Sequence, residues 1–157
     1  MTRIGITGHR NIPESALSEI VHRLAAELKA PADEALSCLA DGADQLFGQI
    51  ALEMRIPLTA VLPADDYEDH LGGDEAVNRY RTLLGACAHT VHMPYRTCSP
   101  EAYEAAGRWI VDRVDHLIAV WDGRPSRGRG GTAQIVAHAR DANVSVTVIW
   151  PPGTVRT

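Results

Sequence analysis

The sequence has few cysteines and almost no lysine, and it lacks both common phosphate-binding signatures. The three cysteines among 157 residues are Cys38, Cys87 and Cys98, and no pair has CxxC spacing, so neither a disulfide framework nor a zinc site is indicated. Lys29 stands alone beside fourteen arginines. Its predicted place near a helix C-terminus argues against a Schiff-base lysine for pyridoxal phosphate. Neither GxGxxG nor GxxxxGK[ST] occurs, so the standard dinucleotide fingerprint and the P-loop are excluded.

Long apolar runs and an excess of positive charge are also absent. No apolar stretch approaches the ~20 residues that a membrane helix needs, and the first residues do not resemble a secretion signal. We therefore expect a cytoplasmic protein without a membrane partner. The net charge is -5, which argues against a broad nucleic-acid interface because duplex binding neutralises many phosphates. We expect no nucleic-acid partner and, because positive charge is local, a small anion as the ligand.

The chain has the size and pattern of one α/β domain. With 45% hydrophobic residues, residues 1–157 are enough for a single domain with a full core. Strand and helix patterns alternate along the chain, which is typical of a three-layer Rossmann-like fold with a mostly parallel sheet of about six strands. The expected strands are 3–7, 35–40, 57–62, 88–93, 115–121 and 144–150. The expected helices are 13–30, 43–55, 75–86, 99–113 and 130–142.

The segment VWDGRPSRGRGGT, residues 120–132, is the most informative part of the sequence. It indicates a buried strand that enters a loop with four glycines and three arginines, after which Thr132 begins a helix. Glycines let backbone N–H groups approach an anion, and a helix N-terminus adds partial positive charge. The loop therefore predicts an anion site for a nucleotide phosphate. A flexible surface loop is the alternative.

A second loop of the same kind follows the first expected strand. Gly8, His9 and Arg10 form a glycine turn before a helix that Pro13 suits at its first turn. A strand, a glycine turn and a helix make up the phosphate-binding half of a nucleotide-binding unit. His9 and Arg10 could contact a phosphate or a base, or they could simply cap the turn; the fork of an arginine side chain suits phosphate.

Unusual polar and glycine residues gather where the expected strands end. In parallel sheets this edge carries the ligand site, near the point where the strand order reverses. Asp44 could stabilise its helix N-terminus or accept hydrogen bonds from a ribose hydroxyl. Asp44 and Asp122 are the candidates for a catalytic base or nucleophile. From this edge we expect Asp122, Gly123 and Arg129 to contribute to the binding site.

An acidic loop at residues 63–74 offers a possible divalent-metal site. Its carboxylates could act as oxygen ligands. Solvated acids around a short helical turn explain the pattern better than a metal site does. We therefore predict no metal site. The carboxylates in question are Asp65, Asp66, Glu68 and Asp69.

The motifs GITGHR, LADGADQLF, IAVWDG and RGRGGTAQIV together resemble the SLOG superfamily, which includes Lonely-guy enzymes and the core of DNA-processing protein A. The resemblance spans the chain from Ile4 to about Ile149. It implies a nucleotide pocket and, together with an apolar helical surface, a homodimer or higher homo-oligomer. The residues implied to border that pocket are Gly8, His9, Arg10, Gly42, Ala43, Asp44, Gly130, Gly131 and Thr132.

One departure from the resemblance bears on catalysis. Lonely-guy phosphoribohydrolases have a motif similar to PGGxGTxxE, in which the glutamate is catalytic. In this sequence Ile135 occupies the position of that glutamate. An aliphatic side chain cannot act as the acid, base or charge stabiliser that glycosidic cleavage needs. We therefore expect a sensor or binding protein for a nucleotide or a nucleotide-derived small molecule, with no required cofactor. A nucleoside-monophosphate phosphoribohydrolase is the alternative.

Overall fold

The computed structural model describes residues 1–29, 32–125 and 131–156. It confirms the α/β fold class: strands and helices alternate along these residues, and their bounds lie close to the expected ones. The strands are β1 (Arg3–Gly8), β2 (Glu34–Ser37), β3 (Leu58–Leu62), β4 (His89–His92), β5 (His116–Val120) and β6 (Ser145–Ile149). The helices are α1 (Glu14–Leu28), α2 (Ala43–Glu53), α3 (Asp74–Ala86), α4 (Pro100–Val111) and α5 (Thr132–Asp141), with a 3₁₀ helix, η1, at Tyr67–His70.

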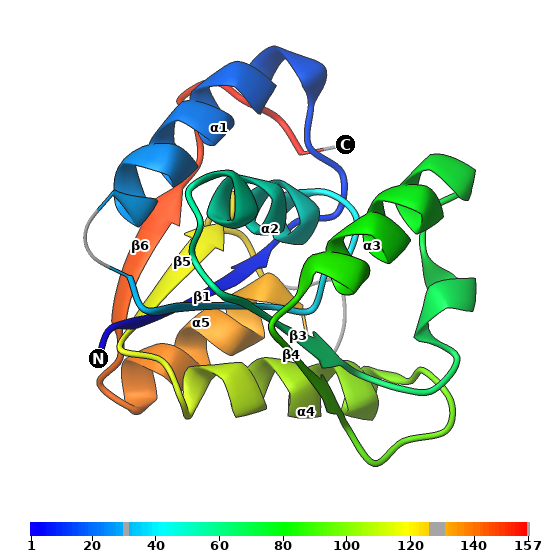
Figure 1. The fold of residues 1–157 in the computed structure, drawn as a ribbon. Helices are drawn as coiled ribbons and strands as arrows, with labels where there is room; N and C mark the ends of the chain where they lie inside the picture. Colours follow the sequence, from blue (N-terminus) through cyan, green and yellow to red (C-terminus); the bar gives the residue numbers. More distant parts are fainter. Residues whose placement is uncertain (30–31, 126–130, 157) are drawn as a thin grey trace.

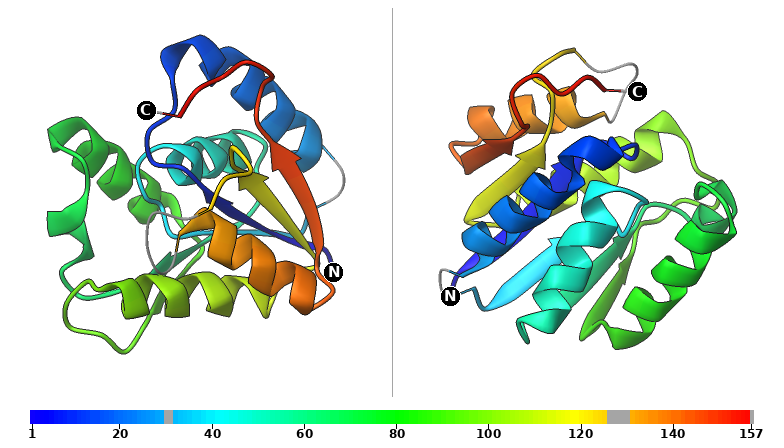
Figure 2. Two further views of the ribbon diagram at one scale, coloured as in Figure 1. Left: turned by 180° about the vertical axis from the view of Figure 1, so that it is seen from behind. Right: turned by 90° about the horizontal axis from the view of Figure 1, so that it is seen from above.

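The strands form one sheet of order β4-β3-β2-β1-β5-β6. Every strand pair in it is parallel. Helices α1, α2 and α3 cover one face, and α4 and α5 cover the other (Figures 1 and 2). The change of face follows from crossovers of one hand: the connections through α1, α2 and α3 run from β1 to β4, and those through α4 and α5 run in the opposite direction, from β4 to β5 and β6. The sheet is therefore enclosed between two helical layers.

The core explains why these segments take up their structures. In α1, the helical spacing of Ile20, Leu24 and Leu28 places all three against the sheet, where they are at most 2% exposed. All five residues of β3 are buried, as expected for a strand covered on both faces. None of the described helices is long and apolar enough to cross a membrane.

The strand order reverses between β1 and β5. These strands pair from Ile4 and His116 to Gly8 and Val120, and the N–H of His9 donates to the carbonyl of Val120 at 3.1 Å. Beyond that bond the segment after β1 turns toward α1, and the segment after β5 leads to α5. The switch point therefore opens a space at the carboxyl edge of the sheet.

The end of the second strand and the C-terminal tail both lie at the carboxyl edge of the sheet. The second strand ends at Ser37, short of the expected residue 40, because Leu39 adopts a left-handed backbone with φ of 58°. Cys38 consequently lies beyond the strand, half-buried. The tail after Trp150 packs on the sheet edge, where Arg156 Nε lies 3.4 Å from Asp122 Oδ2.

Candidate functional site

A cavity of about 380 Å³ lies over the carboxyl ends of β1 and β2, on the face covered by α4 and α5. This volume falls in the range of small-molecule sites. One part of its wall is apolar and comes mainly from α4, α5 and β5. The other part is polar and comes from the turn after β1 and the start of α2. The lining includes Thr7, Gly8, His9, Arg10, Asn11, Cys38, Asp44, Tyr67, Tyr103, Gly107, Ile110, Leu117, Gly131, Thr132, Ile135 and Arg156.

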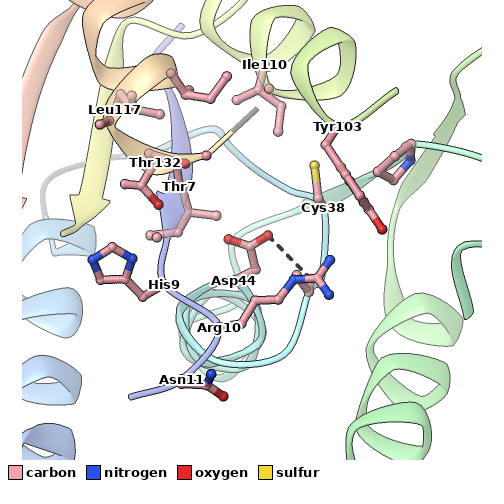
Figure 3. A pocket seen from close by; sticks show the side chains of 18 of the residues that line it. Thr7, His9, Arg10, Asn11, Cys38, Asp44, Tyr103, Ile110, Leu117 and Thr132 are labelled. Carbon is pink, nitrogen blue, oxygen red and sulfur yellow. Dashed lines mark hydrogen bonds between the residues drawn. The ribbon is translucent and has the colours of Figure 1, made fainter. Parts of the chain in front are cut away.

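The cavity brings together several residues that the sequence singles out. Gly8, His9 and Arg10 lie on its wall together with Asp44, Gly131 and Thr132, although these residues are far apart in the chain. Figure 3 shows Thr132 beside His9, and Arg10 reaching toward Tyr103 on the opposite side, with Asp44 between them. Arg129 and Gly130 lie outside the described residues. The binding role of the whole set stays a prediction.

Gly42 and Ala43 lie beneath the turn and are not part of the cavity lining. Gly42 has φ of 84°, and a side chain there would clash with the carbonyl oxygens of His9 and Arg10. The N–H of Ala43 donates to the carbonyl of His9 at 3.2 Å. The DGAD motif therefore supports the turn after β1, and the resemblance that implied a bordering role is corrected for these two positions.

Asp122 and Gly123 also do not line the cavity. Asp122 faces a smaller depression of about 150 Å³ beside Trp150 and the C-terminal tail. Its carboxylate lies 3.3 Å from His9 Nε2 and 3.4 Å from Arg156 Nε, and its side chain is 6% exposed. Burial raises the pKa of Asp122, but the N–H of Arg124 and the nearby His9 outweigh this effect and lower it. Asp122 is therefore an ionised structural partner that joins the ends of β1 and β5 to the tail.

Asp44 is the only buried carboxylate in the described lining of the cavity. It sits in the first turn of α2 and is 8% exposed. Burial raises the pKa of Asp44 to about 7, although the N–H of Ala40 at 3.4 Å and the charge of Arg10 act in the opposite direction. The carboxyl group can therefore lose or gain a proton near neutral pH, which suits both hydrogen-bond donation and acceptance.

Arg10 supplies positive charge beside Asp44. Its guanidinium lies 5.4 Å from the ring centre of Tyr103 and donates to the carbonyl of His70 at 3.2 Å. Burial lowers the pKa of Arg10, but Tyr67 and Asp41 outweigh this effect and raise it. Asp41 lies 3.9 Å away, and its Oδ1 is buried without a hydrogen-bond partner among the described residues. Arg10 is thus held charged and in place.

The other end of the cavity is the first turn of α5. Gly131 is the N-cap and Thr132 the first helical residue, 8% exposed. The first N–H groups of a helix have no partner within the helix and carry partial positive charge. Ile135, one turn later, packs against Gly107 of α4, where an added Cβ would lie 2.5 Å from its Cδ1. The position expected for a catalytic glutamate is therefore part of an apolar wall.

Sequence reasoning missed several residues of the cavity wall. Tyr67 and Tyr103 come from η1 and α4, and Arg156 comes from the tail. Their local patterns are those of ordinary core and surface positions, so no motif marks them. Only the packing of η1 and α4 around Arg10 could reveal the two tyrosines.

No protein-family model and no curated protein matches the sequence. Solved structures do match the fold. DNA processing protein A from Helicobacter pylori, studied for its single-stranded DNA binding mode, aligns with a TM-score of 0.70 at 16% identity, over 99% of this chain and 68% of its own. The Streptococcus pneumoniae protein aligns at 0.65 and 19% identity, over 98% and 51%. A molybdenum cofactor binding protein from Rippkaea orientalis aligns at 0.62 and 17% identity, over 94% and 75%.

These neighbours correct one expectation and support another. The chain spans about half the length of the S. pneumoniae protein. From the net charge we expected no nucleic-acid partner, and this expectation is wrong. The Helicobacter pylori protein, which has the same fold, was studied for the way in which it binds single-stranded DNA. The cofactor-binding neighbour shows that the fold can also serve a small molecule. At the level of fold, the resemblance seen in the sequence is confirmed: the chain has the Rossmann-like fold that it shares with the two DNA processing proteins.

Proposed function

We propose that the protein binds a nucleotide or a nucleotide-derived small molecule in the cavity at the carboxyl edge of the sheet. One observation carries the proposal. The turn after β1, the buried Asp44 and the first turn of α5 meet at one cavity of about 380 Å³ at the point where the strand order reverses. Open parallel sheets bind their ligands at this place.

The first turn of α5 suits the anionic end of such a ligand. The N-cap Gly131 has no side chain to block the approach, and Thr132 adds a hydroxyl at the cavity wall. Helix N-termini of this kind bind phosphate through backbone N–H groups and the helix dipole. Arg10 lies toward the other side of the cavity (Figure 3). The ligand's second polar end, such as a base carbonyl, therefore fits Arg10 better than the same phosphate does.

The space between these ends suits a sugar and a base. Asp44 lies between Thr132 and Arg10, where its carboxyl group can exchange hydrogen bonds with ribose hydroxyls (Figure 3). The apolar wall beside it includes Ile110, Leu117 and Ile135. Apolar side chains of this kind bury the faces of a base, while a few polar groups fix its orientation.

Binding without cleavage fits these residues better than glycosidic hydrolysis. Ile135 contributes no acid or base, and Asp122 is engaged by His9 and Arg156. Asp44 is then the one carboxylate of the described lining that could assist a reaction. Release of free base from a nucleoside monophosphate, abolished in Asp44→Asn, would favour the hydrolase over the binding protein.

Thermal unfolding and calorimetry with a set of nucleoside 5′-monophosphates and inorganic phosphate test the proposal. A ligand at about 100 times its Kd should stabilise the folded protein by about 2.7 kcal/mol. Arg10→Gln should weaken that binding by about tenfold or more, since a hydrogen bond to a charged group contributes about 1.5–3 kcal/mol. Arg113→Gln, an exposed arginine stacked on Trp109, is the matched control. Absence of binding by every nucleotide would contradict the proposal.

Single-stranded DNA is a second candidate ligand because two neighbours of the same fold are DNA processing proteins, one of them described by its single-stranded DNA binding mode. Fluorescence anisotropy of a labelled oligothymidylate, followed at low and then moderate salt, measures it. Binding that falls with salt and is displaced by a nucleoside monophosphate would indicate that both ligands use the cavity edge. No anisotropy change at low salt would exclude this candidate.

A further inference from the structure

Within the described part of the chain, one group of side chains has the composition of a metal site. Asp66, His70 and Cys98 each offer a ligand atom, and these atoms all lie within 4.8 Å of one another. Asp66 immediately precedes η1, His70 ends it, and Cys98 lies in the loop between β4 and α4. The group lies outside the cavity lining and is separate from the proposed ligand site.

The spacing of these atoms suits tetrahedral coordination. His70 Nε2 lies 3.2 Å from Asp66 Oδ2. Two ligands with metal bonds of ~2.1 Å at a tetrahedral angle are separated by about 3.4 Å. A cation between these two atoms would therefore need little movement. The Cys98 sulfur, within 4.8 Å of both, could approach as a third ligand by a side-chain rotation.

The backbone already holds the two loops together. The N–H of Cys98 donates to Asp66 Oδ1 at 2.7 Å, and the N–H of Asp65 donates to the carbonyl of Tyr95 at 3.0 Å. The hydrogen bond to Oδ1 orients the Asp66 carboxylate, and its other oxygen, Oδ2, lies toward His70. The other acids of this loop do not join the group: Glu68, for example, is engaged by Arg81 at 2.6 Å and 3.0 Å.

We propose that Asp66, His70 and Cys98 form a binding site for a Zn²⁺-class cation. Thiolate and imidazole ligands select Zn²⁺ over Mg²⁺ and Ca²⁺, which prefer sets of oxygen ligands. The His70 side chain is 47% exposed, so a fourth position is open to water or to an anion. Binding releases the thiol proton of Cys98 to solvent, because the thiolate is the ligand.

The site would connect the metal to the neighbouring cavity. The carbonyl of His70 accepts a hydrogen bond from Arg10, whose guanidinium lies over Tyr103. The side chain of Cys98 also lies close enough to Tyr103 for each group to shift the pKa of the other. A bound cation would therefore hold η1 and the loop before α4 in place against Arg10 and Tyr103, the two residues at one end of the cavity. On the proposed function, metal binding would therefore be coupled to ligand binding at that end of the cavity.

Cobalt substitution reports the proposed ligands directly. Titration of the metal-free protein with Co²⁺ should produce a thiolate-to-metal charge-transfer absorption, which Zn²⁺ displaces and Mg²⁺ does not. Cys98→Ser should abolish this absorption, and calorimetry should show Zn²⁺ affinity reduced at least about tenfold. Cys87→Ser, a change at another half-buried cysteine, should leave both unchanged.

A second variant keeps the test independent of folding defects in Cys98→Ser. His70→Asn alters an exposed side chain and should likewise weaken Zn²⁺ binding at least about tenfold while leaving the circular dichroism spectrum intact. Equal Zn²⁺ affinity in the wild type and both variants, or a cobalt complex without thiolate absorption, would overturn the proposal. Neither readout uses nucleotides, so the result is independent of the proposed function.

Discussion

The titration of Asp44 is the most direct test of the site's electrostatics. This carboxyl group is 8% exposed, and its pKa of about 7 in the folded protein compares with an ordinary value of 3.8. Between about pH 4 and about pH 7, Asp44 therefore keeps its proton in the folded state, whereas it has already lost it in the unfolded chain. The free energy of unfolding must consequently fall as the pH rises from about 4 to about 7.

The magnitude follows from the shift. Each pKa unit corresponds to about 1.4 kcal/mol, so burial of the charged carboxylate destabilises the folded state by up to about 4 kcal/mol above pH 7. At about pH 5 most of this penalty is not yet present. Asp44→Asn removes the charge, and the amide oxygen can still accept the N–H of Ala40. The stability gain of the variant over wild type should then grow by about 2–3 kcal/mol between about pH 5 and about pH 8.

Urea unfolding at several pH values measures this difference. Asp141→Asn makes the same chemical change at an exposed position of α5 and serves as the matched control. A gain in Asp44→Asn that is constant across the range would refute the reasoning, because it would mean that the folded state does not hold the extra proton. A variant less stable than wild type at high pH would refute it as well.

Three further changes test the supports of the site. Gly42→Ala should destabilise the protein by about 2–4 kcal/mol in urea unfolding, because φ is 84° and the added methyl group meets the carbonyl of Arg10. Asp122→Asn should reduce stability by about 2–4 kcal/mol at neutral pH by leaving Arg156 partly unpaired; since the pKa of Asp122 is lowered, this difference should vanish as the pH falls through the folded value. Thr132→Val should weaken nucleotide binding by calorimetry about five- to tenfold through loss of a hydroxyl donor.

Each of these changes has a matched control. Gly85→Ala lies within α3 with nothing within 4 Å of the added atom, and it should stabilise the protein slightly. Asp112→Asn removes a carboxylate that is 56% exposed beside His138, and Thr90→Val changes an exposed threonine of β4. If a site variant and its control behaved alike, the supporting role assigned to that residue would be wrong.

The sequence by itself determined the order and the type of the secondary structure elements. Period-two and helical apolar patterns reflect local burial, which each segment carries in its own residues, as Ile20, Leu24 and Leu28 do in α1. Parallel strands follow because each one is separated from the next by a helix. The gathering of Gly8, Arg10, Asp44 and Thr132 at one cavity could be anticipated in the same way, since each of them ends a strand or lies in the segment after one.

Only the tertiary structure decided which of these residues share a surface. Strand order and backbone geometry depend on contacts between distant segments, so local patterns could not show that Gly42 supports the turn from below or that Asp122 turns toward Arg156. The same holds for Asp66 and Cys98, which are 32 positions apart yet joined by a hydrogen bond. Side chains without a distinctive local pattern become part of a site only when packing fixes their neighbours.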